Sequence, residues 1–119
     1  MKQFALLFRM DITNPEAQPS KEQMKIYMEQ WMAWLKGIAA TQQLADGGNH
    51  FSQDGVVLKP KDTTIEGPYT SENLSVAGYI LIYADSFDDA IIIAKKCPIL
   101  QGENTSVEIR ELASIVTVK

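Results

Sequence analysis

Two segments of this chain carry apolar side chains on both sides of a predicted strand, and this feature constrains the fold most. They are residues 3–10 and 78–84. In the first segment, one side of the strand carries Phe4, Leu6, Phe8 and Met10. The opposite side carries Ala5 and Leu7. Strands that are apolar on both sides lie inside a sheet whose two faces are both covered. We therefore expect these two strands in the middle of a sheet.

Two amphipathic segments are predicted to cover one face of that sheet. Apolar residues recur at spacings of three and four in segments 24–39 and 87–97, which is the pattern of a helix with one buried side. Ser20 and Ser86 are predicted N-caps, each followed three residues later by a capping-box partner. Pro98 is predicted to end the second helix, because proline cannot continue a helical hydrogen-bond ladder.

Short strands are predicted between the helices and after the second helix. Residues 46–49, Asp-Gly-Gly-Asn, read as the turn that ends the first helical region. Segments 56–58 and 63–66 read as short strands joined by a tight turn. Segment 105–112 alternates between apolar and polar residues, and the tail 113–118 is predicted as one more strand.

This order is the βαββαβ pattern of a ferredoxin-like α+β fold with an antiparallel sheet. We expect one domain over residues 1–119, with both helices on the same side of the sheet. The other side would then expose apolar side chains to water, at a cost of roughly 25 cal/mol per Å². A second copy of the chain is the simplest cover, because two-fold dimers are the commonest oligomers. The sequence therefore predicts a homodimer.

Charge and cysteine content argue against several classes of partner. The 11 Lys and Arg residues are scattered among 15 Asp and Glu, so no nucleic-acid partner is expected. The single cysteine, Cys97, excludes an internal disulfide and fits a reducing cytoplasm. One His and one Cys without paired spacing cannot build a zinc site, so we expect no metal. No nucleotide-binding loop and no transmembrane stretch is present, so we expect no cofactor and no membrane partner.

Several landmarks follow one another along nearly the whole chain: Trp31-Met32-Ala33-Trp34, Gly47-Gly48, Glu66-Gly67-Pro68-Tyr69, Gly78-Tyr79, Ala94-Lys95-Lys96-Cys97-Pro98 and Val107-Glu108-Ile109-Arg110. In this order they resemble the YCII-related family, in particular the branch named for its Asp-Gly-Pro-Phe (DGPF) motif. The resemblance implies a dimeric α/β barrel, in which two ferredoxin-like units pack sheet to sheet. It also implies a similarity in outline to cofactor-free isomerases, cyclases and monooxygenases.

The motif departs from its type in this chain. Glu66 replaces the usual Asp, and Tyr69 replaces the usual Phe. In the YCII side of the family a His–Asp pair has been proposed as an active site, with the His in the region of the first helix. That helix has no histidine here, so this mechanism does not carry over.

Two functions are compatible with these residues. In the first, a homodimeric module binds a small apolar or aromatic molecule in a cleft between helix and sheet. Its ligand-binding residues would be Trp31, Tyr69, Ser71 and Tyr79, which supply aromatic surface and hydroxyl groups. Trp31 also fits a purely structural place in the core.

In the second, the protein is a cofactor-independent isomerase or lyase. Its general acid or base would be His50 or Glu66, with Asp46 as a further choice. The structural interpretation is that His50 is an exposed turn residue and that Glu66 accepts backbone hydrogen bonds at its turn. The two functions differ in whether His50 lies in a cleft within reach of Glu66, Tyr69 or Tyr79.

Overall fold

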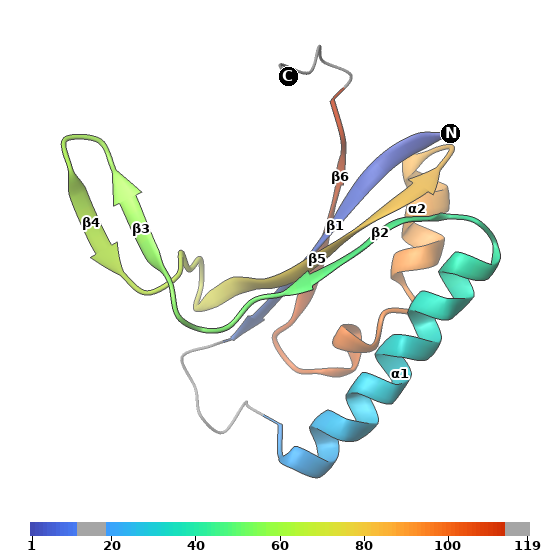
Figure 1. Cartoon of the computed structure of the whole chain (residues 1–119), viewed down its shortest axis with the longest axis horizontal. Coiled ribbons are helices and arrows are strands. Elements are labelled where there is room, and N and C mark those ends of the chain that lie inside the picture. The colour runs from blue at the N-terminus through green and yellow to red at the C-terminus, as the bar shows by residue number, and fades with distance from the viewer. Residues whose placement is uncertain (12–18, 114–119) are drawn as a thin grey trace.

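The computed structural model describes residues 1–11 and 19–113, and in it two helices cover one face of a four-stranded antiparallel sheet (Figure 1). The elements are β1 (Lys2–Asp11), α1 (Lys21–Ala40), β2 (Leu44–His50), β3 (Val56–Lys59), β4 (Thr63–Glu66), β5 (Leu74–Ala84), α2 (Phe87–Ala94), the 3-10 turn η2 (Pro98–Gln101) and β6 (Ser106–Glu111). The strand order is β2-β5-β1-β6. The fold is α+β and compatible with a ferredoxin-like fold, and the predicted central pair, β1 and β5, is confirmed.

The core lies between the sheet and the helices. Phe4, Leu6 and Phe8 of β1 are buried there with Ile80 and Ile82 of β5. The helices contribute their apolar stripes, which consist of Trp31, Trp34 and Ile38 of α1 and Ala90 and Ala94 of α2. Since alternate residues of a strand point to opposite faces, this packing also decides which side chains lie on the helix-free face.

The helix ends follow the predicted signals in part. The Ser20 hydroxyl accepts a hydrogen bond from the Gln23 N–H, and the Gln23 side chain accepts one from the Ser20 N–H, so the first capping box is confirmed. Ser86 caps α2 by accepting from the Asp89 N–H at 3.2 Å. The prediction that Pro98 ends α2 is wrong, because the helix stops at Ala94. Pro98 begins η2 instead, where its fixed φ suits the first position of a turn.

The prediction of a turn at residues 46–49 is also wrong, since these residues belong to the edge strand β2. Two register shifts interrupt its pairing with β5, and Gly48 has a φ of 64°. The Asp46 carboxylate accepts a hydrogen bond from the Gly48 N–H at 2.8 Å. The glycines thus produce a bulged strand rather than a chain reversal, and sequence reasoning could not separate the two.

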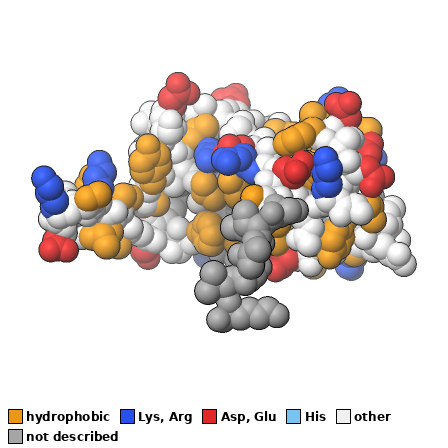
Figure 2. Space-filling view, turned by 90° about the horizontal axis from the view of Figure 1, so that it is seen from above, with side chains coloured by type: hydrophobic (Ala, Val, Ile, Leu, Met, Phe, Trp, Pro, Cys, Tyr) orange, Lys and Arg blue, Asp and Glu red, His pale blue; other side chains and the backbone are white. Residues whose placement is uncertain are grey.

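Strands β3 and β4 form a hairpin that stands away from the rest of the molecule (Figure 1). The predicted short strands between the helices are therefore confirmed, but they make a separate two-stranded sheet. Hydrophobic side chains are exposed on this hairpin, at the left end of Figure 2, and they include Val56, Leu58 and Ile65.

The helix-free face of the sheet is apolar at its centre. We call this patch the open face, and it comprises Ala5 and Leu7 of β1 with Tyr79, Leu81 and Tyr83 of β5. All five side chains are half-buried, and the paired register places Ala5 opposite Leu81 and Leu7 opposite Tyr79. An apolar patch on the helix-free side was predicted, and the register shows that Phe4, Leu6 and Phe8 do not belong to it.

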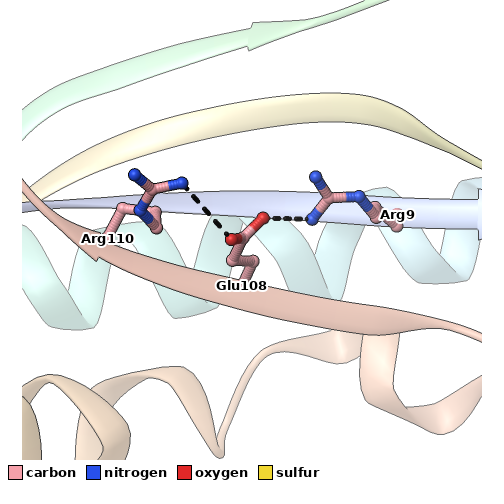
Figure 3. A network of polar contacts seen from close by, with 3 residues as sticks. All are labelled: Arg9, Glu108 and Arg110. Carbon is pink, nitrogen blue, oxygen red and sulfur yellow. Dashed lines mark hydrogen bonds and ion pairs between the residues drawn. The ribbon is translucent and has the colours of Figure 1, made fainter. Parts of the chain in front are cut away.

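A charged cluster borders the open face on the β6 side (Figure 3). Arg9 Nη1 donates to Glu108 Oε1 at 2.6 Å, and Arg110 Nη1 lies 3.6 Å from Glu108 Oε2. The hydrogen bond from Arg9 holds the pKa of Glu108 below its usual range. The three ionised groups leave this border with one net positive charge.

Among the residues that the structure describes, no helix is long and apolar enough to cross a membrane. Most of the predicted tail strand 113–118 lies outside the described residues.

Candidate functional site

A cleft of about 850 Å³ opens between the N-terminal half of α1 and the sheet. Its walls come from α1, the ends of β1 and β5, the segment after β2, and the turn after η2. The residues that give the cleft its apolar character include Phe8, Met24, Ile26, Tyr27 and Trp31, whereas the ring of Phe51, which also touches the lining, packs against Tyr79 at 6.0 Å between centroids. A concave apolar site of this size is typical of small-molecule binding.

Trp31 forms the aromatic floor of the cleft and is itself buried. Its ring packs edge-on against Phe8 at 4.8 Å and against Trp34 at 5.1 Å, measured between ring centroids. Tyr27 stacks on it at 6.0 Å. Trp31 therefore belongs to the core and lines the cleft, so the two interpretations of this residue do not exclude one another.

His50 reaches the cleft because two glycines let β2 approach β5. It is the last residue of β2 and lies opposite Gly78. A Cβ atom at position 78 would come within 2.6 Å of the Asn49 carbonyl oxygen, so only glycine fits there without a shift. The next residue, Phe51, donates its N–H to the Ala77 carbonyl at 2.7 Å. This backbone geometry directs the imidazole onto Trp31.

The imidazole of His50 packs edge-on against the Trp31 ring, with 4.9 Å between centroids. His50 as a whole residue is exposed, but the contact with Trp31 removes part of the water around its ring, and this desolvation lowers the pKa of His50 below its ordinary value of 6.5. Within residues 1–11 and 19–113, no side chain forms a hydrogen bond or an ion pair with the imidazole. His50 is thus a neutral ring at neutral pH, with its nitrogen atoms available to a ligand.

Two other titratable groups in this region are held in their neutral forms. Burial, aided by the nearby Cys97, raises the pKa of Tyr27, so its hydroxyl stays protonated. Burial also raises the pKa of the Cys97 thiol to about 12. Cys97 is buried, and a buried thiol in its neutral form is a poor nucleophile.

The charged residues that line the cleft are both acidic. They are Asp11, at the end of β1, and Glu103, in the turn after η2. In the part of the chain that the structure describes, no lysine or arginine lines the cleft. The hydroxyls of two lining residues are already engaged, because Ser75 donates to the Tyr69 carbonyl and Thr105 donates to the Ile99 carbonyl, each at 2.7 Å.

The structure brings Trp31 and His50 into the cleft but leaves the other sequence candidates outside its lining. Glu66 is exposed at the end of β4, and Tyr69 is 71% exposed. Ser71 pairs with Leu74 in an isolated β-bridge, and Tyr79 lies on the open face. The Asp46 carboxylate accepts a hydrogen bond from Gly48 within β2. The expected acid–base partners of His50 therefore all lie outside the lining.

Sequence reasoning missed several lining residues. The sequence identified Met24 and Tyr27 only as members of the apolar stripe of the helix. No pattern in the sequence shows that this end of the stripe lines a cleft. Phe51 directly follows His50, but no pattern in the sequence marks Phe51 as a lining residue. Glu103 lies in a turn far along the chain, so only the fold brings it to the cleft.

Comparison of the sequence with models of protein families and with curated proteins yields no match. The resemblance to the YCII-related family therefore stays a prediction.

Proposed function

We propose that this protein binds a small apolar or aromatic molecule in the cleft between α1 and the sheet. The observation that carries the proposal is the aromatic floor of Trp31, Tyr27 and Phe8 beneath an open volume of about 850 Å³. Ligand sites commonly measure about 300–1,000 Å³ and combine apolar walls with a few polar groups. His50 and the amides of Gln23 and Gln30 supply such polar groups here.

Exposed apolar side chains at the mouth of the cleft add support. Met24 and Ile26 line it and are 40% and 56% exposed. Apolar groups that face a concave surface gain free energy when a ligand displaces the water there, at roughly 25 cal/mol per Å² of apolar surface buried. A flexible methionine at this place can also adapt its shape to a ligand.

Met24→Gln should weaken binding of the neutral fluorescent probe N-phenyl-1-naphthylamine by about threefold or more, because the amide lowers the apolar contact of the cleft. The change keeps side-chain length and adds no charge. Met32→Gln is the matched control, since Met32 lies on the same helix, is 48% exposed and does not line the cleft. The dissociation constants come from fluorescence titration. Equal affinities of the two variants would contradict the proposal.

We further propose that the protein works as a homodimer that packs through the open face, as the resemblance to dimeric α/β barrels implies. Five half-buried apolar side chains cover the centre of this face, and no helix of the described chain covers them. The Arg9–Glu108–Arg110 cluster at its border would meet solvent or polar groups of the partner. A polar rim around an apolar centre is the usual anatomy of a subunit interface.

A catalytic role for His50 is the second candidate function. The observation that favours it is the position of this imidazole, which lines an apolar cleft and is neutral at neutral pH. A neutral imidazole in such surroundings can accept a proton from a bound substrate. Glu66, the other proposed acid or base, lies outside the cleft and does not share this support.

The ring opening of 5-nitrobenzisoxazole tests this candidate, because it requires only a base and an apolar aromatic substrate. We expect His50→Gln to lower the protein-dependent rate about a hundredfold, the usual contribution of a positioned base. The wild-type rate should fall as the pH drops through the lowered pKa of His50 and the imidazole becomes protonated. Glu66→Gln is the control and should leave the rate unchanged. A His50→Gln variant with the wild-type rate would refute the catalytic role.

A further inference from the structure

The charge of the cleft carries information on the ligand beyond its apolar character. Asp11 and Glu103 are the charged lining residues, and no lysine or arginine of the described chain lines the cleft. Lys21 and Lys25 belong to the same end of α1 but lie outside the lining. The cleft is therefore apolar, and Glu103 places a negative charge at its border.

We infer that the ligand of this cleft is a cationic aromatic molecule, such as an aromatic ring that bears a protonated amine. The inference rests on the proposed function and adds the charge of the ligand to it. The apolar ring would occupy the volume over Trp31, and the ammonium group would lie toward the side of Glu103.

The carboxylate of Glu103 is available to such a group. It is exposed and, within the described residues, forms no ion pair and no side-chain hydrogen bond. A carboxylate that is already paired would gain little from a second cation, whereas this one keeps its full charge. At the edge of a low-dielectric cleft, the attraction between unit charges is stronger than in bulk water.

The aromatic lining favours a cation for a second reason. Tyr27 lines the cleft beside Trp31, and its ring stacks on the Trp31 ring. The faces of aromatic rings carry negative electrostatic potential and attract ammonium groups within about 6 Å. Rings combined with a carboxylate form a common recognition site for amines, and both are present here.

One feature of the cleft would favour an anion, and it is offset. The N-terminus of α1 reaches the lining through Pro19 and Gln23, and helix N-termini attract negative charge. The capping box already uses the N–H groups of Ser20 and Gln23. Glu22 adds a negative charge to the first turn. Among the described lining residues, a phosphate or carboxylate ligand would thus find no cationic side chain and few unpaired donors.

Three probes of the same shape separate the charge of the ligand from its apolar part: 2-naphthylmethylamine, 2-naphthalenemethanol and 2-naphthoate. At neutral pH they are a cation, a neutral molecule and an anion. Calorimetric titration of the full chain should show that the amine binds about fivefold more tightly than the alcohol, and the carboxylate more weakly than both. Added salt should reduce the preference for the amine.

Glu103→Gln should lower the affinity for the amine about threefold and leave the affinity for the alcohol unchanged, so that most of the preference for the amine is lost. Glu29→Gln is the matched control, because it removes the same charge from α1 outside the cleft and should leave the preference unchanged. Equal binding of the three probes, tighter binding of the carboxylate, or an unchanged preference in Glu103→Gln would overturn the inference while the proposed function stands. Binding of none of the probes would overturn both.

Discussion

Gly48→Ala is expected to destabilise the protein by about 3 kcal/mol or more, the range of changes that force a backbone clash and strain. Gly48 has a φ of 64°, which residues with a side chain rarely adopt. A Cβ atom there would lie 1.6 Å from the Tyr79 carbonyl oxygen and 2.6 Å from its carbon. Because these are backbone atoms of the central strand β5, no side-chain rotation can relieve the clash, and β2 must move away.

The neighbouring Gly47→Ala is the matched control. A Cβ atom at position 47 would have no atom within 4 Å, so this change should alter the free energy of unfolding by less than about 1 kcal/mol. Urea unfolding at one fixed protein concentration measures both variants, since a dimer would make stability depend on concentration. If the two variants lose the same stability, the close approach of β2 to β5 is not what requires glycine here.

Gly48→Ala should also disturb the lining of the cleft, because the close approach of β2 to β5 positions the imidazole of His50. Displacement of β2 would separate the imidazole from the Trp31 ring, which it now meets at 4.9 Å. The chain has one histidine, so its ring protons can be followed by NMR without ambiguity. In a folded Gly48→Ala protein we expect the histidine pKa to move up toward 6.5 as the ring gains water.

Leu7→Lys is expected to convert the proposed homodimer into monomer or aggregate. Leu7 lies on the open face, opposite Tyr79 in the register with β5 and opposite Glu108 in the register with β6. Obligate interfaces bury roughly 2,000 Å² or more and resemble a domain core cut in half. An ammonium group in the middle of such an interface would lose its water, and the neighbouring Glu108 is already paired with Arg9 and Arg110, so the cost is several kcal/mol.

Light scattering at low micromolar concentration measures the mass of each variant in solution. Met32→Lys serves as the control, since it adds the same charge to an exposed position of α1 on the other side of the sheet. Circular dichroism shows whether each variant is folded. A wild-type protein that is a folded monomer at this concentration would refute the dimer, and a Leu7→Lys protein that remains dimeric would place the interface elsewhere.

Local patterns were sufficient to predict the secondary structure of most of this chain. The helical stripes, the Ser20 capping box and the alternation of β6 act within a few residues, so neighbouring positions contain the whole signal. Glycine gave the main error. At residues 46–49 it was interpreted as a turn, although its lack of a side chain serves a close contact with a strand about 30 positions away. No local pattern distinguishes these two uses of glycine.

The candidate site could be predicted only in part for the same reason. Trp31 and His50 were singled out for their chemistry, and both line the cleft. Glu66 was chosen as a possible acid or base, and Tyr69 and Ser71 for their hydroxyl groups, but the fold places all three at the exposed hairpin and in the loop that follows it. Glu103 enters the cleft through the turn after η2, and only chain topology brings this turn beside α1.

By itself, the sequence determined that β1 and β5 lie together at the centre of the sheet, because each is apolar on both sides. Which side the helices cover was decided only by the tertiary structure. Phe8 packs against Trp31 and Trp34 of α1 and Phe4 packs against Phe87 of α2, while Ala5 and Leu7 are left on the open face. Periodicity identifies the two sides of a strand but not their surroundings. The choice depends on how large side chains from distant segments fill one common volume, and that packing exists only once the chain has folded.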